Sequence, residues 1–253
     1  MKKHALGIYA ALALAFLHAP LVVLIAFSFN ASRFTVWEGF SLRWYQAALA
    51  DPQLAEGLLN SVIIAVVASA IATVIGTLAA WGMWRRSAPV LSGTLYLSLV
   101  TPEIVTGISL LALFQWAFRF LHLRLGIFTV IMAHVAFSIA YVAIVVSARL
   151  RDYDRTLEEA AMDLGAGEWR AFRLVTLPLL APAVAAAGLL ALVVSFDDYV
   201  ITSLVAGVDS ETLPMVVYAM ARRGVSPVVN AVSAFIVVLF GGLILLSQRL
   251  QQK

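Results

Sequence analysis

Long apolar stretches with few charged residues recur along this chain, and polar or charged positions separate them. A helix needs about 20 mostly apolar residues to cross the hydrocarbon core of a membrane. Six stretches reach that length, approximately over residues 5–29, 56–85, 89–118, 124–149, 183–206 and 223–249. The pattern predicts an all-α protein with six transmembrane helices, and the even number of spans places both termini on the same side of the membrane.

The composition agrees with a membrane protein and removes several other classes. Of the 253 residues, 62% are hydrophobic and 12% are charged, whereas a soluble domain carries about 25% charged residues. We interpret the net charge of +3 as basic loops on the inner side of a membrane and not as a nucleic-acid surface. The chain has no cysteine, which excludes disulfides, thiolate metal sites and cysteine nucleophiles.

The distribution of lysine and arginine predicts the orientation, because cytoplasmic loops carry the excess of basic residues. With the N-terminus inside, the larger set falls on the inner side: Lys2, Lys3, Arg85, Arg86, Arg149, Arg151, Arg155, Arg170, Arg173, Arg249 and Lys253. The smaller set falls outside: Arg33, Arg43, Arg119, Arg124, Arg222 and Arg223. We therefore expect a multi-pass membrane protein with a cytoplasmic N-terminus and C-terminus.

A cleaved signal peptide is the alternative for the first apolar stretch, and Lys2 and Lys3 would suit it. The stretch has roughly 25 apolar residues, more than the 7–15 of a signal-peptide core. We expect an uncleaved anchor helix.

The polar segment between the fourth and fifth spans, about residues 148–182, has the most informative pattern. Thr156 and Glu159 form a T-x-x-E sequence, which predicts a capping box and a helix start. Helical spacing gives this helix one small apolar face, made by Leu157, Ala160, Ala161 and Leu164. Gly165 is expected to end the helix in the left-handed conformation.

A second short helix is expected over residues 168–176, after which Pro178 and Pro182 restrict the chain before the fifth span. The residues by themselves fit two interpretations. The segment is either a surface that docks a partner protein or a solvated loop with two incidental helices.

The same segment resembles the EAA motif of ABC importer permeases, through Glu159-Ala160-Ala161, Gly165 and Leu177-Pro178. The resemblance implies a coupling helix that docks into a groove of a partner ATPase. It assigns the ATPase contact to Glu159, a close-packing face to Ala160 and Ala161, and the turn between the two helices to Gly165.

The chain itself lacks the sequence needed to bind ATP in a P-loop. Its lysines are Lys2, Lys3 and Lys253, and none follows a glycine, as the P-loop lysine must. We expect a non-catalytic subunit without a cofactor or metal site, with ATP and Mg bound by a separate ATPase chain.

More of the chain is similar to the second of the two permeases of spermidine/putrescine importers. The matching segments are Thr101 to Gly107, then His134, Phe137, Tyr141 and Ala148-Arg149-Leu150, then Ser195 to Val200, and finally Leu213-Pro214, Gly224 to Pro227 and Asn230-Ala231. Family members often carry a proline where this chain has Ala140, so the fourth span is expected to be straighter there.

This resemblance implies a type I ABC importer permease fold and a location in the bacterial inner membrane. It divides the chain into an anchor helix and periplasmic segment (1–56), the ABC transporter transmembrane domain (57–248, with the coupling loop at about 148–182) and a cytoplasmic tail (249–253). The implied partners are an ABC ATPase dimer, a second homologous permease, a periplasmic substrate-binding protein and membrane lipid, with no nucleic acid.

Three acidic residues, Glu103, Asp197 and Asp198, lie within predicted spans. A central aspartate costs about 2.5–3.5 kcal/mol on insertion scales, and such residues usually face a cavity or a partner. Their sign suits a polyamine. Adjacent helical residues point about 100° apart, so the two aspartates should differ in environment, and we expect Asp198 to be the more exposed.

Two interpretations of these acids remain. They either line a substrate pathway, with Tyr199 and Phe196 stacking on alkylammonium groups, or they satisfy hydrogen-bond donors between helices. His134, on an apolar helix, is expected to be packed and hydrogen-bonded rather than a ligand.

The alternatives for function are a permease of the same fold for another small organic solute, iron or phosphonate, and an ion-coupled secondary transporter. Secondary transporters often show inverted repeats, and no such repeat is apparent in this sequence.

Overall fold

The computed structural model describes residues 2–34, 36–121, 124–224 and 227–251. Within these ranges every regular element is a helix, and residues 30 and 40 form one isolated antiparallel bridge. Val225 and Ser226 of the matching segment Gly224 to Pro227, and residues 252–253 of the predicted tail, lie outside the described residues. The chain forms two compact units: residues 1–55 together with 216–253, and residues 56–215.

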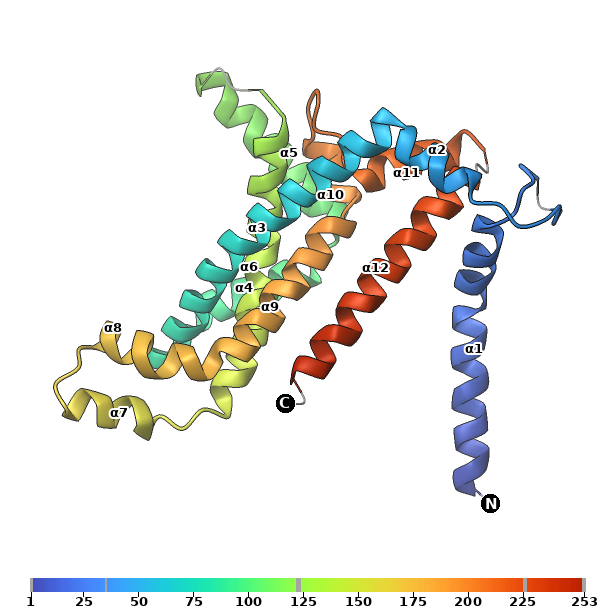
Figure 1. Ribbon diagram of the computed structural model, residues 1–253. Coiled ribbons are helices and arrows are strands. Elements are labelled where there is room, and N and C mark those ends of the chain that lie inside the picture. Colours follow the sequence, from blue (N-terminus) through green and yellow to red (C-terminus); the bar gives the residue numbers. More distant parts are fainter. Residues whose placement is uncertain (1, 35, 122–123, 225–226, 252–253) are drawn as a thin grey trace. The chain divides into compact units, whose positions relative to one another are not determined.

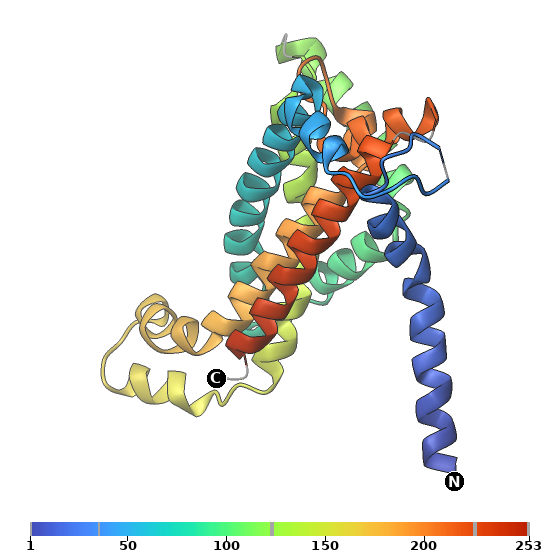
Figure 2. The same ribbon diagram turned by 45° about the vertical axis from the view of Figure 1, so that its right-hand side comes forward.

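The first unit contains α1 (Lys2–Ser28), α2 (Arg43–Ala50) and α12 (Pro227–Gln251), and α12 packs against the other two. In Figures 1 and 2, α1 and α12 are close at one end and diverge toward the other. In the apolar stretch Leu6–Ser28, the most hydropathic part contains no buried residue. A buried Asn30 orders the connection to α2, because its backbone oxygen accepts a 2.8 Å hydrogen bond from the Trp44 indole.

The second unit is built on α3 (Pro52–Arg85), α6 (Ile127–Arg151) and α9 (Leu177–Asp197). Small residues bring these helices close together. A β-carbon added at Gly76 of α3 would lie 2.7 Å from Cβ of Val142 in α6, and one at Gly188 of α9 would lie 2.9 Å from Oγ1 of Thr73 in α3. Close backbone approach at small residues is a common way to pack helices in membranes.

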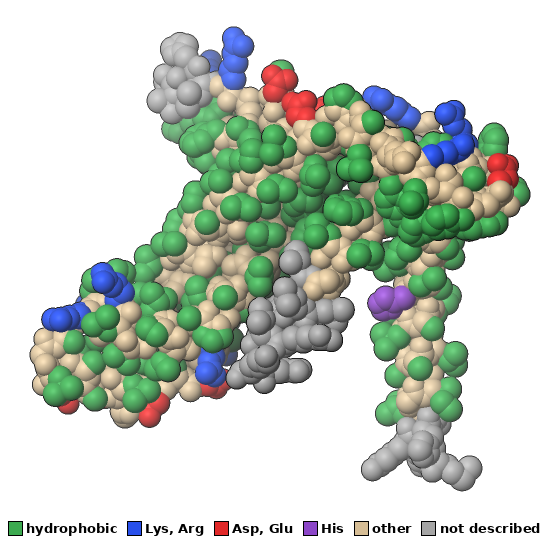
Figure 3. Space-filling model, in the orientation of Figure 1, with side chains coloured by type: hydrophobic (Ala, Val, Ile, Leu, Met, Phe, Trp, Pro, Cys, Tyr) green, Lys and Arg blue, Asp and Glu red, His purple; other side chains and the backbone are tan. Residues whose placement is uncertain are grey.

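Shorter helices complete this unit and its borders: α4 (Pro89–Val100), α5 (Glu103–Leu121), α7 (Thr156–Asp163), α8 (Glu168–Ala171), α10 (Val200–Val205) and α11 (Leu213–Arg222). In the view of Figure 3, hydrophobic side chains cover much of the surface of α3 and α9. Charged side chains gather near the α7–α8 loop and at the opposite end of α3. This distribution is the one expected for helices that cross a membrane.

Four described helices are long and apolar enough to span a membrane, and a fifth span results if the bent pair α4–α5 is counted as one. The sixth predicted span coincides with α12, whose described apolar part is Pro227–Gly242. The all-α expectation and the membrane class are confirmed, whereas the extents of two predicted spans are wrong.

The third predicted span is broken. Helices α4 and α5 meet at an angle of 111°, and the break falls at Thr101 and Pro102. Proline has no amide hydrogen to donate and disfavours helical geometry in the residue before it. Accordingly, Thr101 is extended, with ψ at 128°.

The fifth span lies earlier in the sequence than the predicted residues 183–206. Helical structure runs without a gap from Glu168 to Asp197, through α8, a π-helical turn (Phe172–Thr176) and α9. Pro178 and Pro182 therefore lie inside this helix instead of before it. The Leu177 amide bonds to the Phe172 carbonyl, five residues back, and this wider turn relieves the crowding that a proline ring causes.

The packing of α3 gives a first prediction. Gly76→Ala should destabilise the protein by about 1–3 kcal/mol, because an added methyl group overpacks a closed interface. The matched control is Gly82→Ala in the same helix, where an added β-carbon meets nothing within 4 Å. Thermal unfolding of the detergent-solubilised protein measures both variants, and equal melting temperatures would contradict the close α3–α6 packing.

Candidate functional site

A cavity of about 360 Å³ lies where the two helix breaks of the second unit meet. The break between α4 and α5 contributes Thr101 and Glu103, and the break between α9 and α10 contributes Asp197, Asp198 and Tyr199. The four residues predicted for a substrate pathway, Glu103, Asp197, Asp198 and Tyr199, thus line one space, although nearly 100 residues separate the first from the others.

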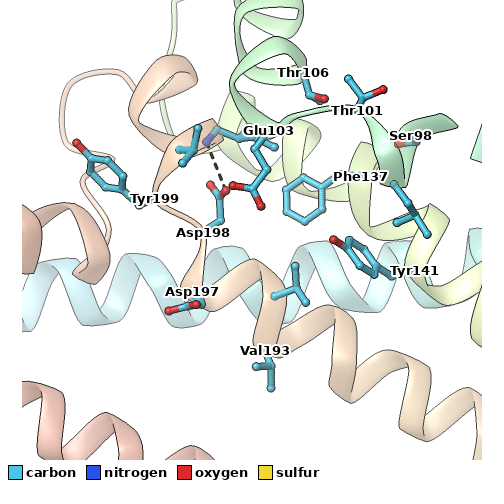
Figure 4. A pocket seen from close by; sticks show the side chains of 14 residues that line it. Ser98, Thr101, Glu103, Thr106, Phe137, Tyr141, Val193, Asp197, Asp198 and Tyr199 are labelled. Atoms are coloured by element: carbon cyan, nitrogen blue, oxygen red, sulfur yellow. Dashed lines mark hydrogen bonds between the residues drawn. The ribbon is translucent and has the colours of Figure 1, made fainter. Parts of the chain in front are cut away.

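Asp198 is built into the start of α10. Its Oδ2 accepts hydrogen bonds from the Thr202 amide at 2.8 Å and the Thr202 hydroxyl at 2.7 Å, and its Oδ1 accepts a 3.4 Å bond from the Ile201 amide. The dashed line in Figure 4 marks the Ile201 bond. A carboxylate is well placed at a helix N-terminus, where the first amide groups have no partner within the helix.

The expectation that Asp198 is the more exposed of the two aspartates is therefore wrong. The side chain of Asp198 is 5% exposed, whereas Asp197 is exposed. The physical reason is the end of α9 at Asp197, which places Asp198 outside the helix and against the free amides of α10. That the two neighbours have different environments is confirmed.

His134 is fully buried and joins three helices. From α6 it lies 2.7 Å from the Ser195 hydroxyl of α9 through Nδ1 and 2.9 Å from the Thr202 hydroxyl of α10 through Nε2. The same Nε2 lies 3.4 Å from Oδ2 of Asp198. The expectation of a packed, hydrogen-bonded histidine is confirmed.

Glu103 and Asp197 are the exposed acids of the cavity. Figure 4 shows the Glu103 carboxylate, from the first turn of α5, pointing toward Asp198, while Asp197 points away from both. The rings of Phe137 and Tyr141 form a wall from α6, with their centroids 6.5 Å apart. Carboxylates beside aromatic faces can bind an alkylammonium group, by charge attraction and by cation–π contact.

The loop between α6 and α9 carries the second group of predicted residues. Helix α7 starts at Thr156 as expected, but the predicted capping box is absent. Asp154 caps the helix in its place, because its Oδ1 accepts bonds from the Thr156 amide at 3.0 Å and the Thr156 hydroxyl at 2.8 Å. Glu159 turns outward, 54% exposed, and pairs with Arg155 at 3.4 Å.

The same two bonds hold the pKa of Asp154 below its ordinary value. The cap is therefore complete above the ordinary aspartate pKa and is lost as the pH falls through the lowered value.

Gly165 ends α7 as predicted. Its φ is +90°, and the Ala166 amide bonds to the Ala161 carbonyl at 3.1 Å while the Gly165 amide bonds to the Met162 carbonyl at 2.9 Å. This pair of bonds is a Schellman motif, which requires a left-handed residue at this position.

The predicted apolar face of α7 is largely open. Leu164 is 91% exposed and Leu157 is 46% exposed, while Ala160 is exposed and Ala161 half-buried. Leu177, the first residue of α9, is half-buried, and Pro178 is exposed.

Sequence reasoning missed the residue that anchors this loop. Glu158, adjacent to Glu159, is 2% exposed and its Oε1 lies 2.8 Å from Nη1 of Arg85 at the end of α3. Two consecutive acids on a short helix suggest a surface that is exposed to solvent. The signal that could have identified Glu158 is the angle of about 100° between consecutive helical side chains, because it lets only one of the two acids point outward.

Comparison with known proteins places these features in a family. The family model described as "Binding-protein-dependent transport system inner membrane component" matches residues 72–253. The chain is 37% identical to the spermidine/putrescine transport system permease protein PotC of Haemophilus influenzae, covering 94% of this chain and 93% of that protein. It is 42% identical to the putrescine transport system permease protein PotI of Escherichia coli, covering 87% of this chain and 81% of that protein.

Two solved structures share the fold. A bacterial ABC transporter that imports the acidic polysaccharide alginate matches with a TM-score of 0.72 at 16% identity, over 98% of this chain and 97% of that chain. The methionine ABC transporter MetNI, in an inward-facing conformation, matches with a TM-score of 0.62 at 17% identity, over 77% of this chain and 91% of that chain.

Proposed function

We propose that this chain, which belongs to the family of inner-membrane components of binding-protein-dependent transport systems, forms half of the pathway by which an ATP-driven ABC importer carries polyamines across the bacterial inner membrane. The observation that carries the proposal is the cavity at the two helix breaks, lined by three carboxylates and by aromatic rings. The chain is a permease subunit and not an enzyme.

The substrate class follows from the charge of the cavity. Spermidine and putrescine are flexible polycations at neutral pH, and Glu103 and Asp197 present exposed carboxylates to them. Asp198 contributes negative charge while its oxygens stay bonded to α10. Tyr199, Phe137 and Tyr141 add faces for cation–π contact along the same space.

Coupling to ATP hydrolysis is assigned to the α7 loop. The open face of α7 docks onto an ABC ATPase dimer, which binds ATP and Mg. Glu159 contacts that partner, Ala160 and Ala161 pack against it, and Gly165 with Leu177 and Pro178 sets the direction of the chain around the turn. The exposure of Leu164 and Leu157 supports this role, because an apolar face is seldom left in water.

The complete importer contains further chains. A second homologous permease forms the other half of the pathway, and a periplasmic binding protein delivers the substrate. In this arrangement residues 1–56 supply an anchor helix and a periplasmic segment, residues 57–248 the transport domain, and residues 249–253 a cytoplasmic tail. Both termini are cytoplasmic, and lipid surrounds the apolar helices.

The orientation can be tested on the naturally cysteine-free chain. Val208→Cys, at a position that is 86% exposed, should react with a membrane-impermeant thiol reagent added outside intact spheroplasts. Gly167→Cys, at an exposed position with open space for a side chain, should react only after permeabilisation. The reverse pattern would invert the proposed topology.

The cation pathway is tested by removing single charges. Asp197→Asn and Glu103→Gln should each lower spermidine and putrescine uptake by about tenfold, which corresponds to about 1.4 kcal/mol and lies near the low end for a hydrogen bond to a charged group. Asp198→Asn should instead lower the amount of folded protein, since it weakens the start of α10. Uptake of radiolabelled substrate, normalised to membrane level, is the measurement.

Glu56→Gln, which neutralises an exposed acid of α3 that does not line the cavity, is the matched control for these variants. Wild-type uptake in both cavity variants at equal membrane levels would leave the polyamine assignment without physical support, and a permease for a different solute would then explain the fold.

The coupling role is tested in the α7 loop. Gly165→Val forces a β-branched residue into φ of +90°, so transport should be lost while the subunit still inserts. Gly167→Val is the matched control, because Gly167 has φ of −68° and open space around it. Glu159→Lys should reduce co-purification of the ATPase. Normal transport and assembly in both Gly165→Val and Glu159→Lys would remove the loop from the coupling mechanism.

A further inference from the structure

The α7 helix is attached to α3 by a buried ion pair. Glu158 lies in the first turn of α7 and Arg85 is the last residue of α3. Their side chains are 2% and 14% exposed, and Oε1 lies 2.8 Å from Nη1. The second carboxylate oxygen of Glu158 accepts a 2.9 Å bond from the hydroxyl of Thr176, in the π-helical turn before α9. Both oxygens of Glu158 are thus engaged, one by each neighbouring element.

Glu158 differs from every other acid of its segment. The remaining acidic residues between positions 152 and 168 are exposed: Asp152, Asp154, Glu159, Asp163 and Glu168. Carboxylates are almost never fully buried unless they are paired. Removing one partner of a buried ion pair destabilises the protein strongly, because the other charge stays buried without compensation. The pair therefore fixes one position of α7 firmly, while the opposite face of the helix stays open.

Aromatic side chains of α3 hold the loop on both sides of this ion pair. Before α7, the ring of Tyr153 packs edge-on against Trp84, with centroids 5.6 Å apart. After α7, the ring of Phe172 lies 4.3 Å from Trp81, and the Arg85 guanidinium lies 5.5 Å from the centroid of the same Trp81 ring. The last two turns of α3 thus bind the loop at three points.

Helix α3 also contacts the elements that form the cavity. Gly76 packs against Val142, the residue after the cavity-lining Tyr141 in α6, and Thr73 packs against Gly188 in α9. At the far end of α3, Ser61 accepts a 2.9 Å bond from the Leu213 amide. A helix of 34 residues without a break transmits a displacement at one end to each of these contacts.

We propose that Arg85 and Glu158 are positioning residues that make α7 and α3 move as one body, so that a displacement of α7 reaches the cavity through α3. The inference rests on the proposed coupling role of α7 and adds the route from that helix to the transport pathway. It assigns to adjacent acids two separate tasks: Glu159 faces the partner ATPase and Glu158 transmits the movement.

The direct test measures the distance between α7 and α3 in the assembled importer. Spin labels are attached at Asp163→Cys, on an exposed position of α7, and at Val74→Cys, 60% exposed on α3. Val74 lies about 16 Å along the helix from Arg85, at 1.5 Å per residue. The distance distribution is recorded by double electron–electron resonance, with and without a non-hydrolysable ATP analogue.

The expected result is one narrow distribution whose mean does not change with the ATP analogue, together with a broader one when Glu158→Gln is added. A mean distance that shifts on ATP binding in the chain with an intact ion pair would overturn the proposal, whatever the variant does.

The functional test uses the same complex in liposomes and measures substrate molecules transported per ATP hydrolysed. Glu158→Gln and Arg85→Gln should each lower this ratio at least fivefold, with the ATPase still co-purifying. The double variant should be no worse than Arg85→Gln alone, since Arg85→Gln already removes the contact with Glu158, together with a 3.2 Å pair to the exposed Glu168. Asp152→Asn, which neutralises an exposed acid that precedes α7, is the matched control and should keep the wild-type ratio.

A wild-type ratio in both single variants would overturn the proposal while leaving the proposed function intact. Failure of the unaltered chain to co-purify with an ATPase or to transport polyamine would instead count against the proposed function. Melting temperatures of the variants separate a change in coupling from a loss of folded protein, because a purely structural role would lower stability without changing the transport ratio of the folded fraction.

Discussion

The amide groups freed at two helix breaks impose the constraint on which the rest of the transport unit depends. In a membrane, a backbone donor or acceptor without a partner costs several kcal/mol. At the second break the carboxylate of Asp198 accepts the amides of Ile201 and Thr202. At the first, the Pro102 carbonyl accepts the Val105 amide, in the first turn of α5. Irregular backbone is tolerated in membranes where it lines a cavity, and here both breaks line the same one.

Two pairs of adjacent acids differ in burial and bonding in the same way. In each pair one residue is buried and bonded, Asp198 in the cavity and Glu158 in the loop, and its neighbour is exposed, Asp197 and Glu159. The rotation between consecutive helical residues, or the end of a helix between them, produces the division. In each pair a carboxylate that is bonded within the protein thus stands directly beside one that is exposed at the surface.

The apolar pattern predicted the fold class and most spans, because the length of an apolar stretch is set by membrane thickness and not by tertiary detail. It failed at Pro102 and at Asp197, where the stretch continues but the helix stops. Hydropathy averaged over a window of residues does not detect such a break, because the residues on both sides of it are apolar. The role of Gly165 was predicted correctly because a left-handed turn is a local property. The capping role predicted for Glu159 was wrong, because its side chain pairs with Arg155 instead. The partners of Asp198 and Glu158 could not be found, since His134 and Arg85 lie more than 60 residues away in the sequence.

The buried network around His134 also constrains how such a chain can evolve. Its ring nitrogens face the hydroxyls of Ser195 and Thr202, and Thr202 in turn bonds to Asp198. A replacement at any of these four positions leaves a buried polar group of another without its partner, so a single substitution is expected to require a compensating one within the set. Asp197 is exposed at the cavity, so its replacement leaves no buried polar group of this network without a partner. Under the proposed function, a change of solute preference made at Asp197 therefore leaves intact the contacts from three helices that fix Asp198.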